Sequence, residues 1–295
     1  MSPAQSQDWT RQALADVESA LQAWVPADAP GGLGQAMRYG VLDGGKRLRA
    51  LLVLAAAQAV QGQTEAALRA AAAVELIHAY SLIHDDMPCM DNDVLRRGKP
   101  TVHVQFGQAQ AMLAGDAMQA LAFEVLTPEQ GVEPAVQARL CGLLARAAGH
   151  AGMAGGQAID LASVGMPLTE EALRDMHRRK TGALLQASVL MGAACGAADE
   201  RVHDALADFG AAMGLAFQVV DDVLDVTQDS GVLGKTAGKD SEQNKPTYVR
   251  LLGLDRARRY ARELRAQAHE ALAASGLTSV HALSMLADKV VDREN

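Results

Sequence analysis

Apolar residues recur along most of the chain at the three- to four-residue spacing of helices that bury one face. No Pro/Ser-rich linker, low-complexity tract or fixed-period repeat separates one part of the chain from another. The pattern therefore predicts a single all-α domain over residues 1–295. The predicted helices cover residues 7–25, 33–41, 47–61, 64–87, 108–127, 133–150, 170–196, 200–227, 255–274 and 278–292.

Some of these helix ends have a local chemical cause. Thr169 can cap the segment EEALRDMH, whose two glutamates lie at the positive end of the helix dipole. Asp255 can cap RARRYARELRAQAHEAL in the same way. Gly276 suits the left-handed residue that ends that helix.

The composition supports a helical protein. Hydrophobic residues make up 49% of the sequence, much of it alanine, whereas aromatic residues make up 3%. Alanine and leucine favour helices because they lose little side-chain freedom there. The net charge of −8 argues against broad attraction to nucleic acid or to anionic lipid.

The cysteines and the apolar segments bear on where the protein resides. Cys89, Cys141 and Cys195 are far apart and include no CxxC, which favours neither a disulfide framework nor a zinc site. Such cysteine usage is typical of a reducing compartment. The start MSPAQSQDWT lacks the regions of a secretory signal, and apolar runs such as LLVLAAAQAV are too short to cross a bilayer. We therefore expect a cytoplasmic protein without integral membrane contact.

Two clusters of aspartate stand out, HDDMPCMDND at 84–93 and FQVVDDVLDV at 217–226. In a helix, Asp221 and Asp225 are one turn apart and lie on one face, where like charges cost a few tenths of a kcal/mol. A hard cation such as Mg²⁺, which takes oxygen ligands, would offset that repulsion. The apolar residues GLAFQVV indicate a buried helix and favour a metal site over a solvated acidic face.

The first cluster has a different spacing. Asp85 and Asp91 are six residues apart and would lie on different faces of a regular helix. Pro88 lacks a backbone donor and clashes with the carbonyl four residues back, so the helix must bulge or break. A two-residue bulge would return Asp91 to the angular position of an i+4 partner.

Other kinds of metal site fit less well. An EF-hand loop starting at Asp85, Asp91 or Asp93 lacks the glycine at its sixth position. His84 and Asp85 could form the dyad of a metal-dependent phosphohydrolase, with His78 as a further ligand. That alternative leaves the second aspartate cluster without a role.

Basic residues are concentrated in the runs GGKRLR (44–49), RRGK (96–99), HRRKTG (177–182) and LGKTAGK (233–239). Most basic runs are solvated faces, but each of these carries glycine, which lets backbone amides approach an anion. Arginine supplies a planar fork for phosphate oxygens. No GxxxxGK[ST] nucleotide loop is present. We infer two diphosphates in one helical cavity, one held through carboxylates and Mg²⁺ and one by Lys and Arg.

Taken together, these motifs closely resemble those of the trans-isoprenyl diphosphate synthases, and in particular the bacterial farnesyl diphosphate synthases. The resemblance runs from about residue 35 to the C-terminus. It rests on YGVLDGGKRLR, VELIHAYSLIHDDMPCMDNDVLRRGKPTVH, LAGDAM, GMAGGQAIDL, HRRKTGALL, GLAFQVVDDVLDV and LGKTAGKD. It implies the isoprenoid synthase fold, an all-α bundle of about ten or more helices around a deep central cavity. It also implies a homodimer with roughly two to three Mg²⁺ ions in each active site.

The resemblance further implies roles for individual residues. The grip on the diphosphate of isopentenyl diphosphate would consist of Lys46, Arg49, His78 and Arg97. The Mg²⁺ ligands would be Asp85, Asp91 and Asp221, and the residues that orient metal-bound water or ligands would be Asp86, Asp222 and Asp225. The allylic diphosphate would bind Arg96, Lys180 and Lys235. The groups beside the developing carbocation would be Lys180, Thr181, Gln218 and Lys245, although ordinary polar pairing of Thr181 with Gln218 is the alternative.

The implied reaction condenses isopentenyl diphosphate with dimethylallyl or geranyl diphosphate to give farnesyl diphosphate. Metal ions neutralise the leaving diphosphate, oxygen dipoles stabilise the allylic cation, and the released diphosphate accepts the proton. Tyr80 lies five residues before Asp85, about 7–8 Å along the helix axis, so Tyr80 and Ser81 would form the floor of the pocket. In the family, an aromatic residue here, or the two extra residues in the first motif, is associated with short products.

Several alternatives remain within and beyond this family. They are a geranyl or geranylgeranyl diphosphate synthase, a non-catalytic subunit of a heteromeric synthase, and a terpene cyclase. A cyclase typically has a different second metal motif and no isopentenyl diphosphate grip, whereas a non-catalytic subunit usually lacks an aspartate motif. GGKRLR and DDVLD therefore favour the transferase.

Two segments add smaller expectations. Asn244 and Val249 stand where bacterial relatives commonly have glycine and proline, which bears on how that loop closes. The glycines of GMAGGQAIDL predict tight helix packing, and its polar side chains are expected to touch the metal–water network. These residues are Gly152, Gly155, Gly156, Gln157 and Asp160.

Overall fold

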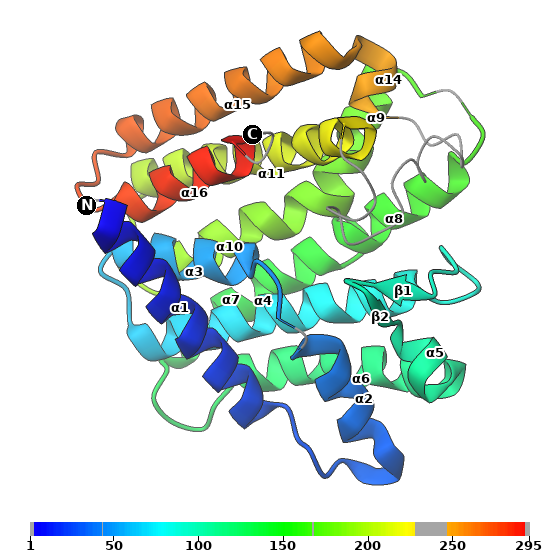
Figure 1. The fold of residues 1–295 in the computed structure, drawn as a ribbon. Coiled ribbons are helices and arrows are strands. Elements are labelled where there is room, and N and C mark those ends of the chain that lie inside the picture. The colour runs from blue at the N-terminus through cyan, green and yellow to red at the C-terminus, as the bar shows by residue number, and fades with distance from the viewer. Residues whose placement is uncertain (1–2, 43, 167, 228–246, 293–295) are drawn as a thin grey trace.

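Helices make up most of the described residues, as the sequence predicts (Figure 1). The computed structural model describes residues 3–42, 44–166, 168–227 and 247–292. Within these ranges the α-helices are α1 Pro3–Trp24, α2 Leu33–Val41, α3 Leu48–Ala59, α4 Thr64–Asp85, α5 Val102–Phe106, α6 Gln108–Leu126, α7 Pro134–Ala148, α8 Met153–Ala162, α9 Glu170–His177, α10 Ala183–Ala194, α11 Glu200–Thr227, α14 Tyr248–Leu252, α15 Leu254–Ser275 and α16 His281–Val291. A short 3₁₀ turn, η1 Pro30–Gly32, precedes α2, and a π-helical segment, η2 Arg178–Gly182, joins α9 to α10. An antiparallel hairpin pairs β1 Leu95–Arg96 with β2 Lys99–Pro100.

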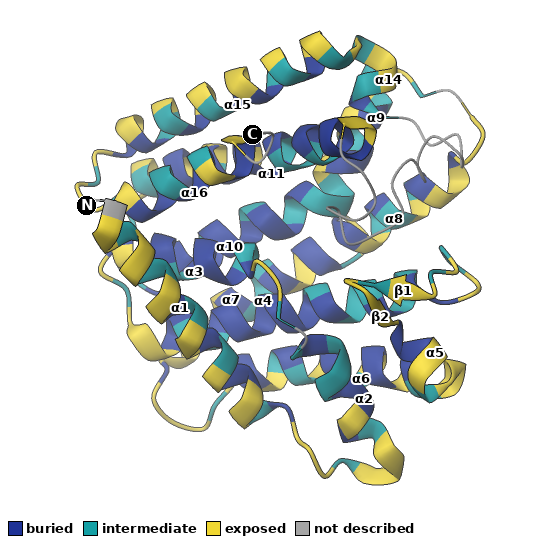
Figure 2. Cartoon of the chain, in the orientation of Figure 1, coloured by how far each residue is buried: buried dark blue, intermediate teal, exposed yellow. Residues whose placement is uncertain are grey.

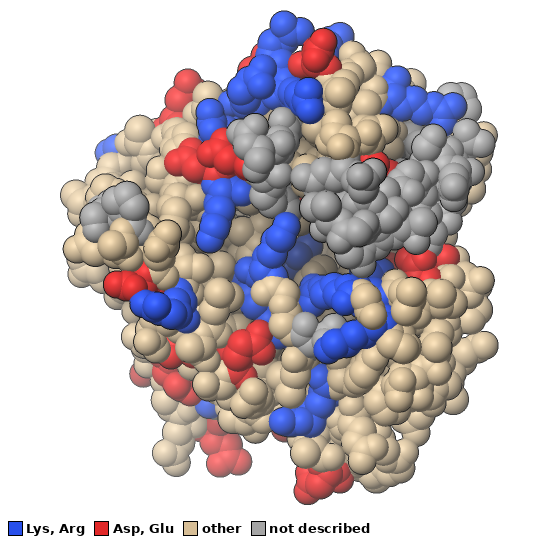
Figure 3. Space-filling model, in the orientation of Figure 1, with Lys and Arg blue, Asp and Glu red and all other residues tan. Residues whose placement is uncertain are grey.

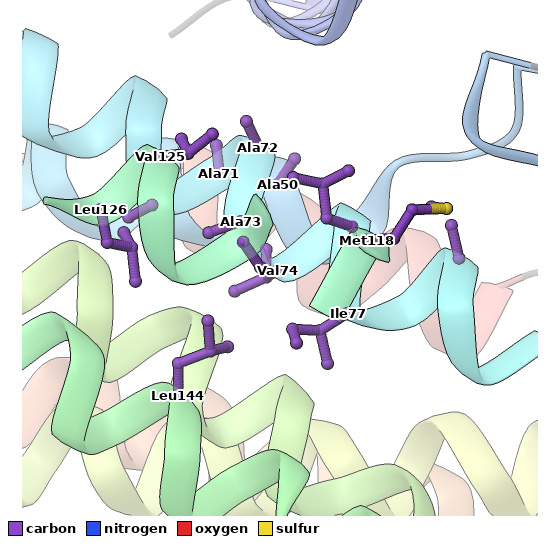
Figure 4. Packing of buried hydrophobic residues seen from close by; sticks show 14 of the residues in the cluster. Ala50, Ala71, Ala72, Ala73, Val74, Ile77, Met118, Val125, Leu126 and Leu144 are labelled. Atoms are coloured by element: carbon purple, nitrogen blue, oxygen red, sulfur yellow. The ribbon is translucent and has the colours of Figure 1, made fainter. Parts of the chain in front are cut away.

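Helix α4 forms the centre of one half of the molecule. Its alanines are buried, so α3 and α6 approach it closely. Figure 4 shows Ala71, Ala72, Ala73, Val74 and Ile77 of α4 in one cluster with Met118, Val125 and Leu126 of α6 and Leu144 of α7. α4 is long and apolar enough to span a membrane by length and composition, but core helices pass the same test, and 67% of its most apolar window is buried inside the protein.

The other half of the molecule is built on α11. α10 and α15 pack against α11, and α16 contacts both α15 and α3 (Figure 1). Figure 2 shows α11 buried along much of its length, while α15 exposes its outer face. The second aspartate cluster therefore lies on a helix whose neighbours hold it in place.

Most predicted helices end within a few residues of their predicted ends, and the all-α fold is confirmed. The helix predicted at 170–196 instead consists of α9, η2 and α10, because the chain inserts a π-helical segment in its middle. α5 and α14 span only one or two turns, which is too short for a periodic pattern. α8 was not predicted because its glycines lower helix propensity.

Two of the three predicted caps are confirmed. The Thr169 hydroxyl accepts a hydrogen bond from the Ala172 N–H at 3.2 Å, and Gly276 is left-handed with φ 71°. The cap predicted at Asp255 is wrong. α15 begins one residue earlier, after Gly253 with φ 82°, because that residue turns the chain sharply from α14 into α15.

Candidate active site

The first aspartate cluster lies where α4 ends. Beyond Asp85 the chain leaves the helix, as Pro88 requires, and the Asp91 N–H donates to the Asp85 carbonyl at 2.8 Å. In a regular helix that carbonyl accepts from the residue four positions ahead. Asp91 thus takes the backbone place of an i+4 partner, in agreement with the predicted two-residue expansion.

The Asp85 carboxylate is poorly solvated. It lines a cavity of about 400 Å³, and burial raises its pKa to about 6. Lys180 opposes that shift, whereas the charge of Asp91 adds to it. The side chains around Asp85 therefore leave its negative charge incompletely compensated, which suits the binding of a cation.

The neighbouring Asp86 has a different environment. It is 3% exposed, and both of its oxygens accept from Arg96, with Nε at 2.9 and 3.0 Å and Nη2 at 2.5 Å. This pair joins the end of α4 to strand β1. The predicted role of Asp86 with metal-bound water and that of Arg96 with the allylic diphosphate stay predictions.

Four arginines lie close enough to His78 of α4 to affect its ionisation. Burial lowers the pKa of this imidazole well below 6.5, and the positive charges of Arg49, Arg97, Arg96 and Arg47 lower it further. His78 is therefore neutral at pH 7. It lines both the 400 Å³ cavity and a smaller one of about 50 Å³, which Arg96 and Arg97 also line.

The loop that carries Lys46 is hydrogen-bonded to one of these arginines, Arg97. The Lys46 side chain is exposed, and Arg97 Nη1 donates to the Gly44 carbonyl at 2.7 Å. Arg49 lines the larger cavity, and its Nε finds no partner among the described residues. Burial lowers the pKa of Arg49, while Glu75 and Asp221 raise it. The charge of the second aspartate cluster therefore reaches the same cavity as Asp85.

A buried ion network beneath this loop was missed by the sequence analysis. Arg47 is 6% exposed, and its Nε lies 2.7 Å from Glu18 of α1 while its Nη1 lies 3.3 Å from Glu75 of α4. Glu75 is 3% exposed and also accepts from the Ala50 N–H in the first turn of α3. Residues from three helices thus fix the turn between Lys46 and Arg49. No local signal could have found this network, because its partners are distant in sequence.

The 400 Å³ cavity is lined by both polar and apolar side chains. Its polar lining includes Arg49, His78, Asp85, Lys180 and Thr181. Tyr80 also lines it and lies edge-on to His84, with ring centroids 5.8 Å apart. The remaining apolar lining includes Met90, Met153 and Leu161. Ser81 also lines the cavity, and its hydroxyl donates to the His78 carbonyl at 2.8 Å.

The π-helical segment η2 carries two of the groups expected beside the carbocation, Lys180 and Thr181, whereas Gln218 lies on α11. Thr181 donates to Gln218 Oε1 at 3.0 Å, so the ordinary polar pairing of these two side chains is present. Thr181 also lines the cavity. Lys180 Nζ lies 2.6 Å from Asp160 of α8. A Cβ at Gly156 would lie 2.2 Å from the backbone nitrogen of Lys180, which confirms tight packing at this glycine.

The other glycines and the amide of this segment are also placed. A Cβ at Gly152 or Gly155 would lie 2.1 or 1.9 Å from a carbonyl oxygen of the preceding turn, so both positions are closely packed. Gln157 lines the cavity, and neither of its amide atoms finds a partner among the described residues. Its predicted contact, and that of Asp160, with a metal–water network stay predictions.

The second aspartate cluster lies near the end of α11. Asp221 is half-buried, whereas Asp222 and Asp225 are 3% and 8% exposed. Lys235 and Lys245 lie outside the described residues, as does Asn244. Val249 lies in α14.

The donor set suits Mg²⁺ that arrives with a diphosphate. Among the described residues, His, Cys, Asp and Glu side chains form no group of three or more that could hold a metal by themselves. Mg²⁺ commonly uses one or two carboxylates and completes its shell with water and substrate phosphates. Lys and Arg side chains gather near the middle of the face in Figure 3, next to a hollow. The residues present therefore fit a magnesium–diphosphate complex.

One buried histidine beside η2 predicts a pH-dependent stability. His177 is 7% exposed, and neither ring nitrogen finds a partner among the described residues. Burial lowers its pKa from 6.5 to about 4, against the opposing charge of Asp160. Because the unfolded chain binds this proton first, the free energy of unfolding should fall by about 1.4 kcal/mol per pH unit as the pH drops from 6.5 to about 4 and should level off below that.

The variant His177→Phe tests this contribution. It keeps a buried ring and removes the titrating group, so it should lose less stability than the wild type between pH 6.5 and 4.5. Urea unfolding at several pH values measures the difference. Parallel losses in the two proteins would show that His177 does not carry the effect.

Comparison with known proteins gives consistent matches. A model of the polyprenyl synthetase family matches residues 31–283. The chain is similar to the heterodimeric geranylgeranyl pyrophosphate synthase large subunit 1, chloroplastic, of Arabidopsis thaliana, with 45% identity over 285 residues that cover 95% of this chain and 77% of that protein. It is equally similar to the chloroplastic geranylgeranyl pyrophosphate synthase of Catharanthus roseus, with 45% identity over 281 residues, 95% of this chain and 79% of that one.

Solved structures agree with these sequence matches. An FPP/GFPP synthase from Zymomonas mobilis aligns with a TM-score of 0.87 and 40% identity over 98% of this chain and 99% of its own. A geranyltransferase from Helicobacter pylori, complexed with magnesium and isoprenyl diphosphate, aligns with a TM-score of 0.85 and 36% identity over 99% of this chain and 97% of its own.

Proposed function

This chain belongs to the polyprenyl synthetase family, and from that premise we propose that its product is farnesyl diphosphate. It is a prenyltransferase that acts on isoprenyl diphosphates. The proposed reaction joins isopentenyl diphosphate to dimethylallyl diphosphate and then to geranyl diphosphate. The single observation that carries the product length is that Tyr80, which precedes Asp85 on α4, lines the cavity.

The proposed chemistry follows from the charged and polar side chains that line the cavity. Mg²⁺, which the Helicobacter pylori geranyltransferase structure contains, would supply when bound the Lewis acid that neutralises the leaving diphosphate. We assign its binding to Asp85, Asp91 and Asp221, with about two to three ions per site. Lys180 would bind the allylic diphosphate through its ammonium group, and Thr181 would present its oxygen to the allylic cation.

The second substrate would bind on the cationic side. Lys46, Arg49, His78 and Arg97 would hold the diphosphate of isopentenyl diphosphate, since three of them are charged and the neutral imidazole can donate one hydrogen bond. Bound there, the double bond of isopentenyl diphosphate would face the allylic carbon. The released diphosphate would accept the proton, so no protein base is required.

Product length separates this proposal from its nearest alternative. The similar plant proteins are named for geranylgeranyl diphosphate, and the Zymomonas protein for farnesyl and geranylfarnesyl diphosphate. We therefore propose to incubate the protein with isopentenyl and dimethylallyl diphosphates and Mg²⁺, remove the phosphates and identify the alcohols by chromatography. Farnesol supports the proposal. Geranylgeraniol would overturn the product length, and the absence of any prenyl alcohol would favour a non-catalytic subunit.

Replacing Tyr80 with alanine should lengthen the product. The tyrosine ring lines the cavity, and its removal would let a chain grow by at least one more five-carbon unit. We expect geranylgeraniol to become a main alcohol in the same assay. Met166→Ala, a change at a 61% exposed residue outside the cavity lining, is the control and should leave the product unchanged. Farnesol alone from Tyr80→Ala would refute the floor role.

Three other properties are proposed with the same function. The assembly is a homodimer, which light scattering would measure directly. The location is cytoplasmic, because the three cysteines are separate and all free. The preferred allylic starter is set by the same cavity, and parallel assays with dimethylallyl and geranyl diphosphates would identify it.

A further inference from the structure

A chain of hydrogen bonds links α14, α11 and η2. The Tyr248 N–H donates to Asp222 Oδ2 at 2.7 Å, and Gln218 Nε2 donates to Asp222 Oδ1 at 2.9 Å. Thr181 then donates to Gln218 Oε1 at 3.0 Å. Asp222 is 3% exposed, and both of its oxygens serve these protein donors. The chain ends at Thr181, which lines the substrate cavity.

The chemistry of Asp222 determines which group donates and which accepts in each of these hydrogen bonds. An ionised carboxylate has no proton and can only accept hydrogen bonds. The atom of Gln218 that faces Asp222 must therefore be the NH₂ group, which leaves the carbonyl oxygen facing Thr181. That oxygen can only accept, so the Thr181 hydroxyl donates its proton to it. The lone pairs of Thr181 then remain for whatever occupies the cavity.

The surrounding backbone holds this arrangement in place. A Cβ at Gly214 would lie 2.7 Å from the Gly182 Cα, so α11 and η2 approach each other closely one turn before Gln218. Tyr248 is fully buried, and its ring lies 5.5 Å from His177 and 6.0 Å from Tyr260. This packing therefore holds the Tyr248 N–H in place beside Asp222.

We propose that Asp222 is a positioning residue that makes oxygen atoms, rather than N–H or O–H protons, face the allylic cation. The proposal rests on the prenyltransfer proposed above. An oxygen dipole stabilises a neighbouring carbocation, whereas a proton donor in the same place repels it. This role differs from the orientation of metal-bound water that the family resemblance implies for Asp222. It acts through Gln218 and Thr181 and requires no contact between Asp222 and the substrate.

The variant Asp222→Asn tests these donor and acceptor roles. The carbonyl of the new amide at position 222 would have to accept from the Tyr248 N–H, which leaves the NH₂ group of that amide toward Gln218. Gln218 would then turn its carbonyl toward position 222 and its NH₂ group toward Thr181. We expect kcat to fall by about 10- to 100-fold, as when one oriented dipole is lost from an active site. KM for both substrates should change by less than about threefold, since binding groups are untouched.

A second substitution should rescue the first. In the Asp222→Asn background, Gln218→Glu supplies a carboxylate that accepts from both position 222 and Thr181, which restores the original direction. We expect kcat to recover at least about tenfold relative to Asp222→Asn. Gln218→Glu alone sets two carboxylates against each other and should be strongly impaired. A residue that merely supported the fold would show no such reciprocal rescue.

Two outcomes would overturn the proposal. In the first, the double variant is no more active than Asp222→Asn, and Asp222→Asn needs a higher Mg²⁺ concentration for half activation than the wild type. That result would assign Asp222 to the metal. The other is rapid hydrogen exchange at the Tyr248 amide of the wild-type protein, where the structure predicts protection that Asp222→Ala removes. The exchange measurement needs no activity. If the wild type forms no prenyl product, the proposed function fails, while the exchange result still tests the hydrogen bonds.

Discussion

Replacing Asp85 with asparagine should lower kcat by about 10³-fold or more while the protein stays folded. The substitution keeps the shape of the side chain and removes the charge that attracts a divalent cation. Asp85 is also the carboxylate whose pKa burial raises to about 6, with the charges of Asp91 and Asp86 adding to the shift. Removing its charge relieves that repulsion, so the metal-free variant should be at least as stable as the wild type.

The two effects are measured separately. Diphosphate release gives kcat and the Mg²⁺ concentration for half activation, which should rise in the variant. Thermal unfolding without metal gives the stability. Asp16→Asn, at an exposed position on α1, is the matched control and should leave both unchanged. A kcat for Asp85→Asn within tenfold of the wild type would remove Asp85 from the metal site.

Replacing Arg47 with methionine should cost about 3–5 kcal/mol of unfolding free energy, because it leaves a buried carboxylate without its partner. Arg47 and Glu75 have side chains that are 4% and 3% exposed, so water cannot take over the lost contact. Arg47 also donates to the Val41 carbonyl at 2.6 Å at the end of α2. The folded fraction of the variant should show a higher KM for isopentenyl diphosphate, since the turn between Lys46 and Arg49 loses its support.

Urea unfolding measures this loss of stability. Arg11→Met is the matched control, because Arg11 pairs with Asp8 at the surface, where both side chains are more than half exposed. That control should cost less than about 1 kcal/mol. A loss of similar size in the two variants would mean that burial of the Arg47 network adds nothing to the fold.

The features predicted from the sequence are those that neighbouring residues determine. α2 begins and ends where its apolar pattern predicts, and Pro88 forces the end of α4. The aspartate and lysine motifs are recognisable because their spacing is local. The π-helical insertion at η2 leaves no periodic signal, since it adds only one residue to a turn.

What the sequence could not reveal depends on contacts between distant segments. Arg47 and Glu75 are 28 residues apart, and Tyr248 and Asp222 are 26 apart. Asp222 also shows that a motif residue can have a second use. Its place beside Asp221 suggests a metal role, but its carboxylate accepts hydrogen bonds from α11 and α14. Only the fold distinguishes these two uses.

The most direct test of the central claim is a crystal structure of the protein grown with Mn²⁺ and inorganic diphosphate. Mn²⁺ takes the oxygen ligands of Mg²⁺ and can be located by its anomalous scattering. We predict anomalous peaks between the diphosphate and the carboxylates of Asp85, Asp91 and Asp221. Ordered diphosphate without an ion beside these three residues, or Mn²⁺ bound only elsewhere, would contradict the claim that both aspartate clusters hold the metal.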